Sequence, residues 1–477
     1  MSALRASQIA AWCEGRIVRG APDRDFAGVS IDSRSVAPGE LFVAIAGPRH
    51  DGHAYLAAAA ARGAAGAIVR ESAPLPDALP GDFCVVGVAD TTRALGLVAA
   101  GHRAGHRGPL VAITGSNGKT TTKEMCAAIL GVRAPCLKTE GNLNNEYGLP
   151  LTLLRRQDRH RSVVVEMGMN HRGEIARLAA IARPTIGVLT NVGTAHIENL
   201  GSREAIAEEK GDLIAALPQD GVAVLNGDDA LASAQGRRSP ARVLRFGLSP
   251  GADVRAEDVR TRAAGYAFRV CAPEGSTRVE VAGLAGTCVL NALAASAGAL
   301  AAGAPLGDLA PGLAAYAPVR GRLEPLALEG DVVVVDDTYN ANPQSMEVAL
   351  RALAEPRGES GVRRIAVLGD MGELGGESEG AHRAAGALAA RLGIDLLFAV
   401  GAHAELVAEA ARAGGLRDAR VQTVADSERA AEVVLAALRP RDRVLVKGSR
   451  SMRMERVVDR IAQARGGRRA ASGDSHA

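Results

Sequence analysis

Short apolar runs recur along the whole chain and alternate with helical stretches and polar turns. Near the start, an alanine-rich stretch at residues 54–62 predicts a helix between two strand-like runs. The strand-like runs of this part occupy residues 41–45, 67–69 and 84–88. Strands that alternate with helices indicate an α/β fold, so we expect residues 1–90 to form a small α/β domain.

A longer central unit, residues 91–317, follows the same pattern and then changes character. It begins with a predicted helix at residues 91–103 and ends with another at about residues 289–302. Short alternating runs at residues 266–270 and 278–281 predict an antiparallel ribbon before that last helix. The buried runs that predict parallel strands occupy residues 110–113, 162–166, 186–190 and 222–225.

The last unit, residues 318–477, alternates strands with helices throughout, which predicts a doubly wound, Rossmann-like α/β domain. From about residue 466 the chain is small, polar and glycine-rich, and we expect a disordered tail. The strand-like runs occupy residues 332–335, 365–368, 396–400, 421–424 and 444–446. The pattern therefore predicts an α/β protein of three domains.

One turn in the central unit has the form of a phosphate-binding loop. It joins the buried run that ends at Ile113 to a predicted helix over residues 123–130. Glycines let backbone N–H groups converge on an anion, and a helix N-terminus adds partial positive charge. We expect Lys119 to reach the β- and γ-phosphates and the Thr120 hydroxyl to bind Mg²⁺. The predicted nucleotide-binding residues are Gly115, Ser116, Asn117, Gly118, Lys119, Thr120 and Thr121.

This loop is shorter than the full motif, because Ile113 stands where the first glycine is expected. An ordinary strand-to-helix turn that contains Gly-Lys-Thr is the alternative interpretation. We favour the phosphate loop because the strand, the glycines, the lysine, the threonine and the helix all fall in order.

Lysine is rare in this chain, with five lysines against 51 arginines. Arginine stays charged in proteins, whereas lysine can lose its proton or be modified, and its compact ammonium fits where a guanidinium cannot. Each lysine is therefore a candidate for a role that arginine cannot take, with chance survival as the alternative. We favour function for Lys119, Lys210 and Lys447 and leave Lys138 open, whereas Lys123 also fits a solvated residue in the first turns of its helix.

Composition narrows the class of protein. The net charge of +3 and the aromatic fraction of 3% give no support for binding to nucleic acid or to a membrane surface. No apolar run reaches the roughly 18 residues of a membrane span. The six cysteines lack C-x-x-C spacing and look like buried thiols of a reducing compartment. We expect a cytoplasmic monomer that neither binds nucleic acid nor inserts into a membrane.

Polar residues follow several strands of the predicted central sheet, where ligands of open α/β sheets bind. The carboxylate of Glu166 suits Mg²⁺, with a capping or turn carboxylate as the alternative. His196 follows the next strand, although a lone histidine is usually an ordinary loop residue. The amides of Asn142, Asn144 and Asn145 suit sugar hydroxyl and phosphate groups, with a plain turn as the alternative.

The last domain carries polar clusters after three of its strands, at residues 336–343, 369–375 and 447–450. Three such clusters at one edge of a sheet indicate a ligand-binding face, since plain turns would rarely align in this way. The clusters contain Asp337, Asn340, Asp370 and Lys447.

Taken together, these motifs resemble those of the Mur ligases, the ATP-dependent amide-forming enzymes of peptidoglycan precursor synthesis, over nearly the whole chain. The family motifs lie at residues 114–121, 141–145, 166–168 and 195–198. The motifs at residues 337–343, 368–375 and 446–450 are most similar to those of the members that add D-alanyl-D-alanine to a UDP-muramoyl tripeptide.

The resemblance implies an N-terminal domain that binds the UDP-linked substrate, a central ATP-binding domain and a C-terminal domain that closes the site. It implies ATP and two Mg²⁺ ions as cofactors, and UDP-muramoyl tripeptide and D-alanyl-D-alanine as partners. The amide bond would form through an acyl phosphate.

The resemblance also implies roles for single residues. Thr120 and Glu166 would hold one Mg²⁺, and His196 a second. Lys210 matches a lysine that the family carbamylates with CO₂, which turns a cation into an oxygen ligand for Mg²⁺. Lys119, Lys210, His196 and Glu166 are thus the implied catalytic residues. The other matches are the ATP contacts Asn291, Arg322 and Asp337 and the substrate-binding residues Ser33, Arg34, Asn142, Asn144, Asn145, Asn340, Asp370 and Lys447.

The sequence departs from the family in one place and leaves several alternatives open. Thr287 and Cys288 stand where the family usually has His-Asn, shortly before the adenine-contacting asparagine. Rival functions are a sister ligase for another amino acid, a folate polyglutamylating enzyme, an ATP-hydrolysing switch and a small-molecule kinase. The third residue of the tripeptide, lysine or diaminopimelate, is also open.

Overall fold

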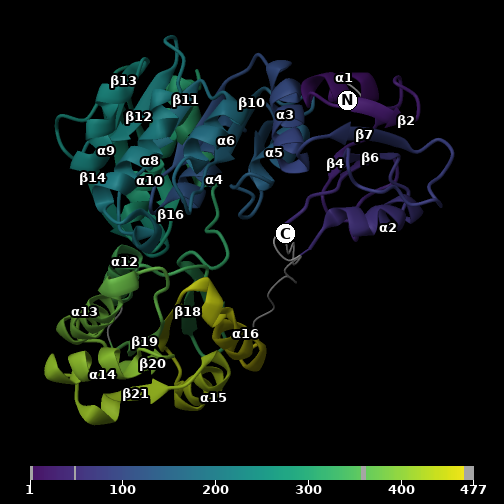
Figure 1. The fold of residues 1–477 in the computed structure, drawn as a ribbon. Helices are drawn as coiled ribbons and strands as arrows, with labels where there is room; N and C mark the ends of the chain where they lie inside the picture. Colours follow the sequence, from purple (N-terminus) through teal and green to yellow (C-terminus); the bar gives the residue numbers. More distant parts are fainter. Residues whose placement is uncertain (1–3, 48–49, 356–360, 467–477) are drawn as a thin grey trace.

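The computed structural model describes residues 4–47, 50–355 and 361–466, which form three α/β units, each with its own main sheet (Figure 1). This confirms the predicted α/β fold of three domains. The predicted disordered tail, apart from its first residue, lies outside the described residues. Within the described ranges, we find no helix with both the length and the apolar character needed to cross a membrane.

The N-terminal unit is a five-stranded sheet in the order β2-β7-β6-β5-β4, with β2 antiparallel to its neighbour. Alternate residues of its strands pack on α2 (Leu56–Ala61) and, on the other face, on α1 (Ala6–Trp12) and α3 (Thr91–Ala104). The predicted helix at residues 54–62 begins instead as a short 3₁₀ turn, η1 (Gly52–Tyr55). The strands of this sheet are β2 (Arg16–Arg19), β4 (Val29–Ser30), β5 (Leu41–Val43), β6 (Gly66–Arg70) and β7 (Cys84–Val88). A separate antiparallel pair is formed by β1 (Leu4–Arg5) and β3 (Asp25–Phe26).

The central unit is a nine-stranded sheet in the order β16-β15-β14-β13-β12-β11-β8-β10-β9. Strands β8 to β14 pair in parallel, and β15 and β16 add the predicted antiparallel ribbon, which continues the sheet. The strands are β8 (Leu110–Thr114), β9 (Cys136–Lys138), β10 (Ser162–Glu166), β11 (Ile186–Leu189), β12 (Val222–Asn226), β13 (Arg242–Gly247), β14 (Val254–Arg262), β15 (Gly265–Ala272) and β16 (Gly275–Ala282).

Helices cover both faces of this sheet and bury two separate hydrophobic clusters. One face carries α3, α5 (Gly148–Leu154), α6 (Glu174–Ala182) and α8 (Arg203–Ala215). The other carries α4 (Lys119–Leu130), α10 (Thr287–Ala301) and α11 (Leu309–Ala314). The remaining short elements are α7 (Ile197–Leu200), α9 (Ala230–Ala234), η2 (Gln235–Arg238) and η3 (Leu306–Asp308).

The C-terminal unit is a six-stranded sheet in the order β17-β18-β22-β19-β20-β21, in which β17 alone pairs antiparallel. Its strands are β17 (Glu324–Leu328), β18 (Val332–Asp337), β19 (Arg364–Gly369), β20 (Leu396–Val400), β21 (Val421–Val424) and β22 (Arg443–Lys447). One face carries α12 (Pro343–Ala354), α13 (Ser378–Arg391) and α14 (Ala404–Ala413), and the other carries α15 (Ser427–Ala437) and α16 (Glu455–Ala464). Three single turns complete the unit: η4 (Gly375–Glu377), η5 (Asp418–Arg420) and η6 (Arg450–Met452).

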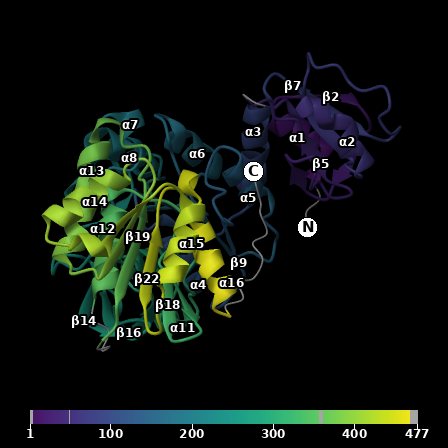
Figure 2. The ribbon, with the colours of Figure 1, turned by 90° about the horizontal axis from the view of Figure 1, so that it is seen from below.

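The arrangement of the units determines which strand ends meet. The N-terminal unit lies to one side, joined to the central unit through α3, which packs on α5 and α6 (Figure 2). The central and C-terminal units face each other, and residues at or just after the carboxyl ends of β8, β10, β11, β18 and β22 line one shared cavity. Carboxyl ends of strands from two sheets therefore meet at the same place, as expected for a ligand site.

Candidate active site

A polar cavity of about 850 Å³ lies between the central and C-terminal units. Thr287 and Cys288, which depart from the family pattern, line it at the start of α10. The predicted site residues that the cavity brings together are Ser116, Asn117, Gly118, Lys119, Thr121, Asn142, Asn144, Asn145, Glu166, His196, Asn291, Arg322, Asp337, Asn340 and Lys447.

The loop between β8 and α4 requires its two glycines. Gly118 precedes α4 with a φ of 80°, a left-handed conformation that disfavours other residues. A Cβ atom at Gly118 would lie 2.3 Å from Oδ1 of Asn291, and one at Gly115 would lie 1.9 Å from Oγ1 of Thr190. The loop therefore packs tightly against its neighbours and leads directly into the N-terminus of α4.

Two residues that we did not predict hold this loop in place. The backbone N–H groups of Ser116 and Asn117 donate to the carbonyl and side-chain oxygens of Asn191, at 3.0 and 2.9 Å. The Thr190 hydroxyl donates to the carbonyl of Asn117 at 2.7 Å. Both residues follow β11 in the run that leads to His196, so the signal was present, but we drew only the histidine from it.

Two lysines interact beside the loop: Lys119, which is partly exposed, and Lys210, which is buried. Lys119 Nζ donates to the Gly115 carbonyl at 2.8 Å, and burial lowers the pKa of Lys119, with Glu166 opposing the shift. Lys210 is 1% exposed on α8, and it does not line the cavity. Burial and the nearby Lys119 hold the pKa of Lys210 well below its usual value, against the opposing charge of Glu209. This shift favours the neutral amine of Lys210, relative to an exposed lysine.

The structure brings the first predicted magnesium pair into direct contact. The Thr120 hydroxyl donates to Glu166 Oε2 at 2.8 Å, and the Asn144 amide donates to Glu166 Oε1 at the same distance. A carboxylate and a hydroxyl beside a phosphate loop are oxygen donors of the kind that Mg²⁺ prefers. These residues therefore fit a magnesium ion, although Thr120 itself lies behind the cavity lining.

His196 contacts a residue of the opposite unit. Its Nδ1 lies 2.7 Å from Oε2 of Glu373, and this contact holds the pKa of Glu373 below its usual range. Both residues have positive φ values, 65° and 61°. Glu373 lies in the predicted cluster at residues 369–375, but we had not singled it out as a site residue.

The C-terminal wall of the cavity is built around a buried ion pair. Lys447 Nζ lies 2.6 Å from Asp337 Oδ2 and donates to the Asn340 carbonyl at 3.0 Å. The Arg322 guanidinium stacks 4.0 Å above the ring of Tyr339. Tyr339 and Lys447 thus contact the predicted ATP-binding residues Arg322 and Asp337 on the side of the cavity that faces the phosphate loop.

Side chains from the two walls also bind each other directly. Asn342 Nδ2 donates to Asn117 Oδ1 at 2.9 Å, and Gln344 Oε1 accepts from the Thr194 hydroxyl at 2.9 Å. The phosphate loop is therefore in contact with the C-terminal unit in this structure.

Three predicted substrate-binding residues lie away from the cavity lining. Arg34 is exposed and pairs with Asp32 at 2.7 Å in the N-terminal unit, beside Ser33. The Asp370 carboxylate accepts from the backbone N–H groups of Ala402 and His403, at 2.8 and 3.0 Å, at the start of α14. Substrate contacts of these residues stay predictions.

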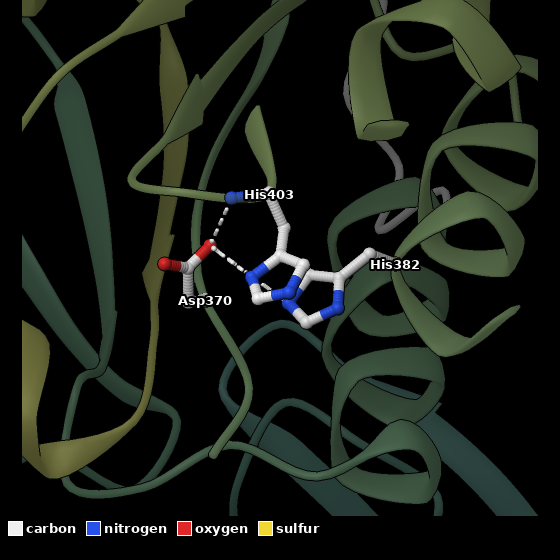
Figure 3. A group of neighbouring side chains, drawn as sticks. All are labelled: Asp370, His382 and His403. Atoms are coloured by element: carbon white, nitrogen blue, oxygen red, sulfur yellow. Dashed lines mark hydrogen bonds and ion pairs between the residues drawn. The ribbon is translucent and has the colours of Figure 1, made fainter. Parts of the chain in front are cut away.

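Asp370 also belongs to a cluster with two histidines (Figure 3). The rings of His382 and His403 stack at 4.2 Å, close enough to Asp370 for the three side chains to surround a metal ion. However, His382 Nε2 accepts from the Met371 N–H at 2.9 Å, and its Nδ1 lies 2.7 Å from the Ser378 carbonyl. Because both ring nitrogens of His382 already have partners, we interpret the cluster as a structural contact that holds the loop after β19 in place.

The chain is similar in sequence to a known family of enzymes and to individual relatives. The chain matches the Mur ligase family, catalytic domain, over residues 25–103, the Mur ligase middle domain over residues 113–299, and the Mur ligase, glutamate ligase domain over residues 321–450. It is 38% identical to the UDP-N-acetylmuramoyl-tripeptide--D-alanyl-D-alanine ligase of Escherichia coli, and the match covers 90% of this chain and 92% of that protein.

Two solved structures have the same fold. MurF from Acinetobacter baumannii superposes with a TM-score of 0.88 at 32% identity, over 97% of this chain and 99% of that one. MurF ligase from Thermotoga maritima in complex with ADP gives a TM-score of 0.78 at 30% identity, over 91% and 97%.

A phosphate loop on one sheet, facing a Rossmann-like unit across a polar cavity, is the arrangement of an α/β enzyme that binds a nucleotide between two units, and the matched relatives make it an ATP-dependent ligase. The chain belongs to the Mur ligase family. The predictions of the family and of an ATP-dependent enzyme that forms an amide bond are confirmed.

Proposed function

We propose that this enzyme joins D-alanyl-D-alanine to UDP-N-acetylmuramoyl-tripeptide in peptidoglycan precursor synthesis. The observation that carries the proposal is one cavity lined both by the phosphate-loop lysine, Lys119, and by the C-terminal pair Asp337 and Lys447. Relatives of that name match nine tenths of the chain, which supports the same substrates here.

The reaction makes a carboxylate reactive enough to join an amine. An oxygen of the terminal carboxylate of the tripeptide attacks the γ-phosphorus of ATP, and ADP leaves. The amine of D-alanyl-D-alanine then attacks the acyl carbon of the acyl phosphate, inorganic phosphate leaves, and the nitrogen loses a proton. Lys119 and the N–H groups at the start of α4 offset the negative charge that gathers as the carboxylate approaches the phosphate.

Magnesium and a carbamate belong to the same proposal. Thr120 and Glu166 would hold one Mg²⁺, and His196 with carbamylated Lys210 would hold a second. When bound, the ions withdraw charge from the phosphate oxygens. The lowered pKa of Lys210 supports the carbamate, because only a neutral amine attacks CO₂, and this step releases one proton.

The three units would divide the work. We assign residues 1–90 to the UDP-linked substrate, residues 91–317 to ATP, and residues 318–477 to closing the site and presenting the amine. The cytoplasm, where nucleotide-linked precursors and ATP are available, is the proposed compartment, and a monomer is the proposed state.

One assay tests the function against its rivals. ATP, Mg²⁺, the UDP-linked tripeptide and D-alanyl-D-alanine are incubated with the enzyme while phosphate release and product mass are followed. We expect stoichiometric phosphate and an amide product, with tripeptides that end in lysine and in diaminopimelate compared side by side. Release of ADP without either substrate would indicate a switch, a stable phosphorylated product a kinase, and reaction with another amino acid or a folate a sister enzyme.

A further inference from the structure

Lys123 is buried, although its sequence position also fits a solvated residue. It lies on α4, four residues after Lys119, and is 0% exposed. A buried ammonium is costly unless hydrogen bonds and an opposite charge compensate for its lost hydration. The alternative of a solvated side chain is therefore wrong, and the contacts of Lys123 indicate what it does.

The Lys123 ammonium binds a carbonyl and a carboxylate. Nζ donates to the Thr139 carbonyl at 2.7 Å and lies 2.8 Å from Oε1 of Glu124. Glu124 also pairs with Lys138, which is partly exposed. Burial works against ionisation of Glu124, but the two lysines hold its pKa below the usual value. The buried charge of Lys123 is thus compensated on the spot.

Thr139 links this ion pair to the predicted magnesium site. Its hydroxyl oxygen accepts from the backbone N–H of Glu166 at 3.0 Å, and its own N–H donates to the Val164 carbonyl at 3.0 Å. Glu166 in turn accepts from Thr120 and from Asn144. Hydrogen bonds, together with the covalent frames of Thr139 and Glu166, therefore connect Lys123 to the Glu166 carboxylate and, through Asn144, to the asparagine loop.

We propose that Lys123 is a positioning residue, which fixes Thr139 and thereby holds Glu166 and the loop of Asn142, Asn144 and Asn145 in their working geometry. The compact ammonium suits this fully buried place, because a guanidinium is larger and carries five N–H donors, more than the one carbonyl and one carboxylate here would satisfy. This explains why lysine persists here in a chain that otherwise uses arginine. The identity of the ligands that Glu166 and the asparagine loop bind rests on the proposed function, but the contacts of Lys123 and Thr139 do not.

Two variants and one control test the proposal. Lys123→Met removes the ammonium at similar length and leaves Glu124 paired with Lys138, whereas Thr139→Val removes the hydroxyl and keeps the carbonyl. Lys138→Met removes the other partner of Glu124 and is the control. The readouts are amide hydrogen exchange at Glu166, affinity for ADP with and without Mg²⁺, and thermal unfolding.

We expect both test variants to speed exchange at the Glu166 amide by about tenfold, because its acceptor is lost or loosened. Magnesium-dependent ADP binding should weaken by about tenfold, while ADP binding without metal stays within about twofold. A variant that combines Lys123→Met with Thr139→Val should bind magnesium ADP no more weakly than either single variant, since both changes act on one chain of contacts. The Lys138→Met control should match the wild type in every readout.

A folded Lys123→Met variant with unchanged exchange at Glu166 and unchanged magnesium-dependent ADP binding would overturn the proposal. If that variant does not fold, Thr139→Val decides, and a normal magnesium dependence there would overturn it as well. These readouts need no peptide substrate. A wild type that binds magnesium ADP but makes no amide would therefore contradict the proposed function and leave the role of Lys123 to be judged separately.

Discussion

The two walls of the cavity are built in different ways. The central wall is held by bonds within one sheet, in which Asn191 and Thr190 bind the phosphate loop. The C-terminal wall has its own rigid pair, Asp337 and Lys447, but it meets the opposite wall through side-chain contacts between units. The first wall is thus held by contacts within its own unit, whereas the second meets it only through contacts between units, which would be lost if the two units moved apart.

The largest effect should come from the central wall. Lys119→Ala should lower kcat for phosphate release by at least about 100-fold, because the charge that meets the phosphates is lost. Steady-state kinetics at saturating substrates measures this loss. A variant that folds normally and retains kcat within tenfold of the wild type would mean that the phosphates bind elsewhere.

Loss of the Lys210 side chain should lower ligation strongly, and small carboxylic acids should restore part of it. Lys210→Ala should lower ligation by about 100-fold, and acetate or formate should restore part of it by replacing the missing carboxylate oxygens. Lys119→Ala is the control, because no small acid can replace a cation. Full activity of Lys210→Ala without any acid would contradict a carbamate at this position.

A change at the docking contact should have a smaller effect. Glu373→Gln weakens the contact with His196, and we expect kcat/KM to fall by about fivefold with an unchanged thermal midpoint, since the pair is partly exposed. Glu377→Gln, in the same loop region, is the control. A gain in activity would show instead that Glu373 restrains His196 and must release it during turnover.

The smallest effect should come from the N-terminal unit. Arg34→Ala should raise the KM for the UDP-linked tripeptide by about threefold and leave the KM for ATP unchanged, because its position is remote from the phosphate loop. Arg16→Ala removes another exposed ion-paired arginine of the same unit and should change neither constant. Equal KM values for Arg34→Ala and wild type would remove this loop from the substrate site.

Features that depend on neighbouring residues in the chain could be predicted from the sequence. The strand-to-helix turn with Gly118 and Lys119 carries its signal within about a dozen residues, so the turn and its place in the cavity were predicted, although α4 begins at Lys119 and not at the predicted residue 123. The same holds for the helices α3 and α10, whose periodicity gave their extent to within about two residues.

Features that depend on packing between distant segments could not be predicted in this way. The burial of Lys123 depends on Thr139, which folds against α4 from the next strand. The contact between Glu373 and His196 joins two units, and no pattern of neighbouring residues predicts it. Asp370 was predicted to bind substrate because it lies at a strand end. Its carboxylate instead accepts from two backbone N–H groups at the start of α14, and a structural residue of this kind also lies at a strand end.

The placement of the lysines has a practical consequence for covalent chemistry. Lys119 and Lys447 line the cavity and Lys123 and Lys210 are buried in the central unit, whereas the Lys138 side chain is 43% exposed. Amine-directed reagents should therefore modify Lys138 first and Lys119, which lines the cavity, next. Because arginines do not react with such reagents, few side chains compete, and the labelling of Lys119 relative to that of Lys138 would report access to the cavity.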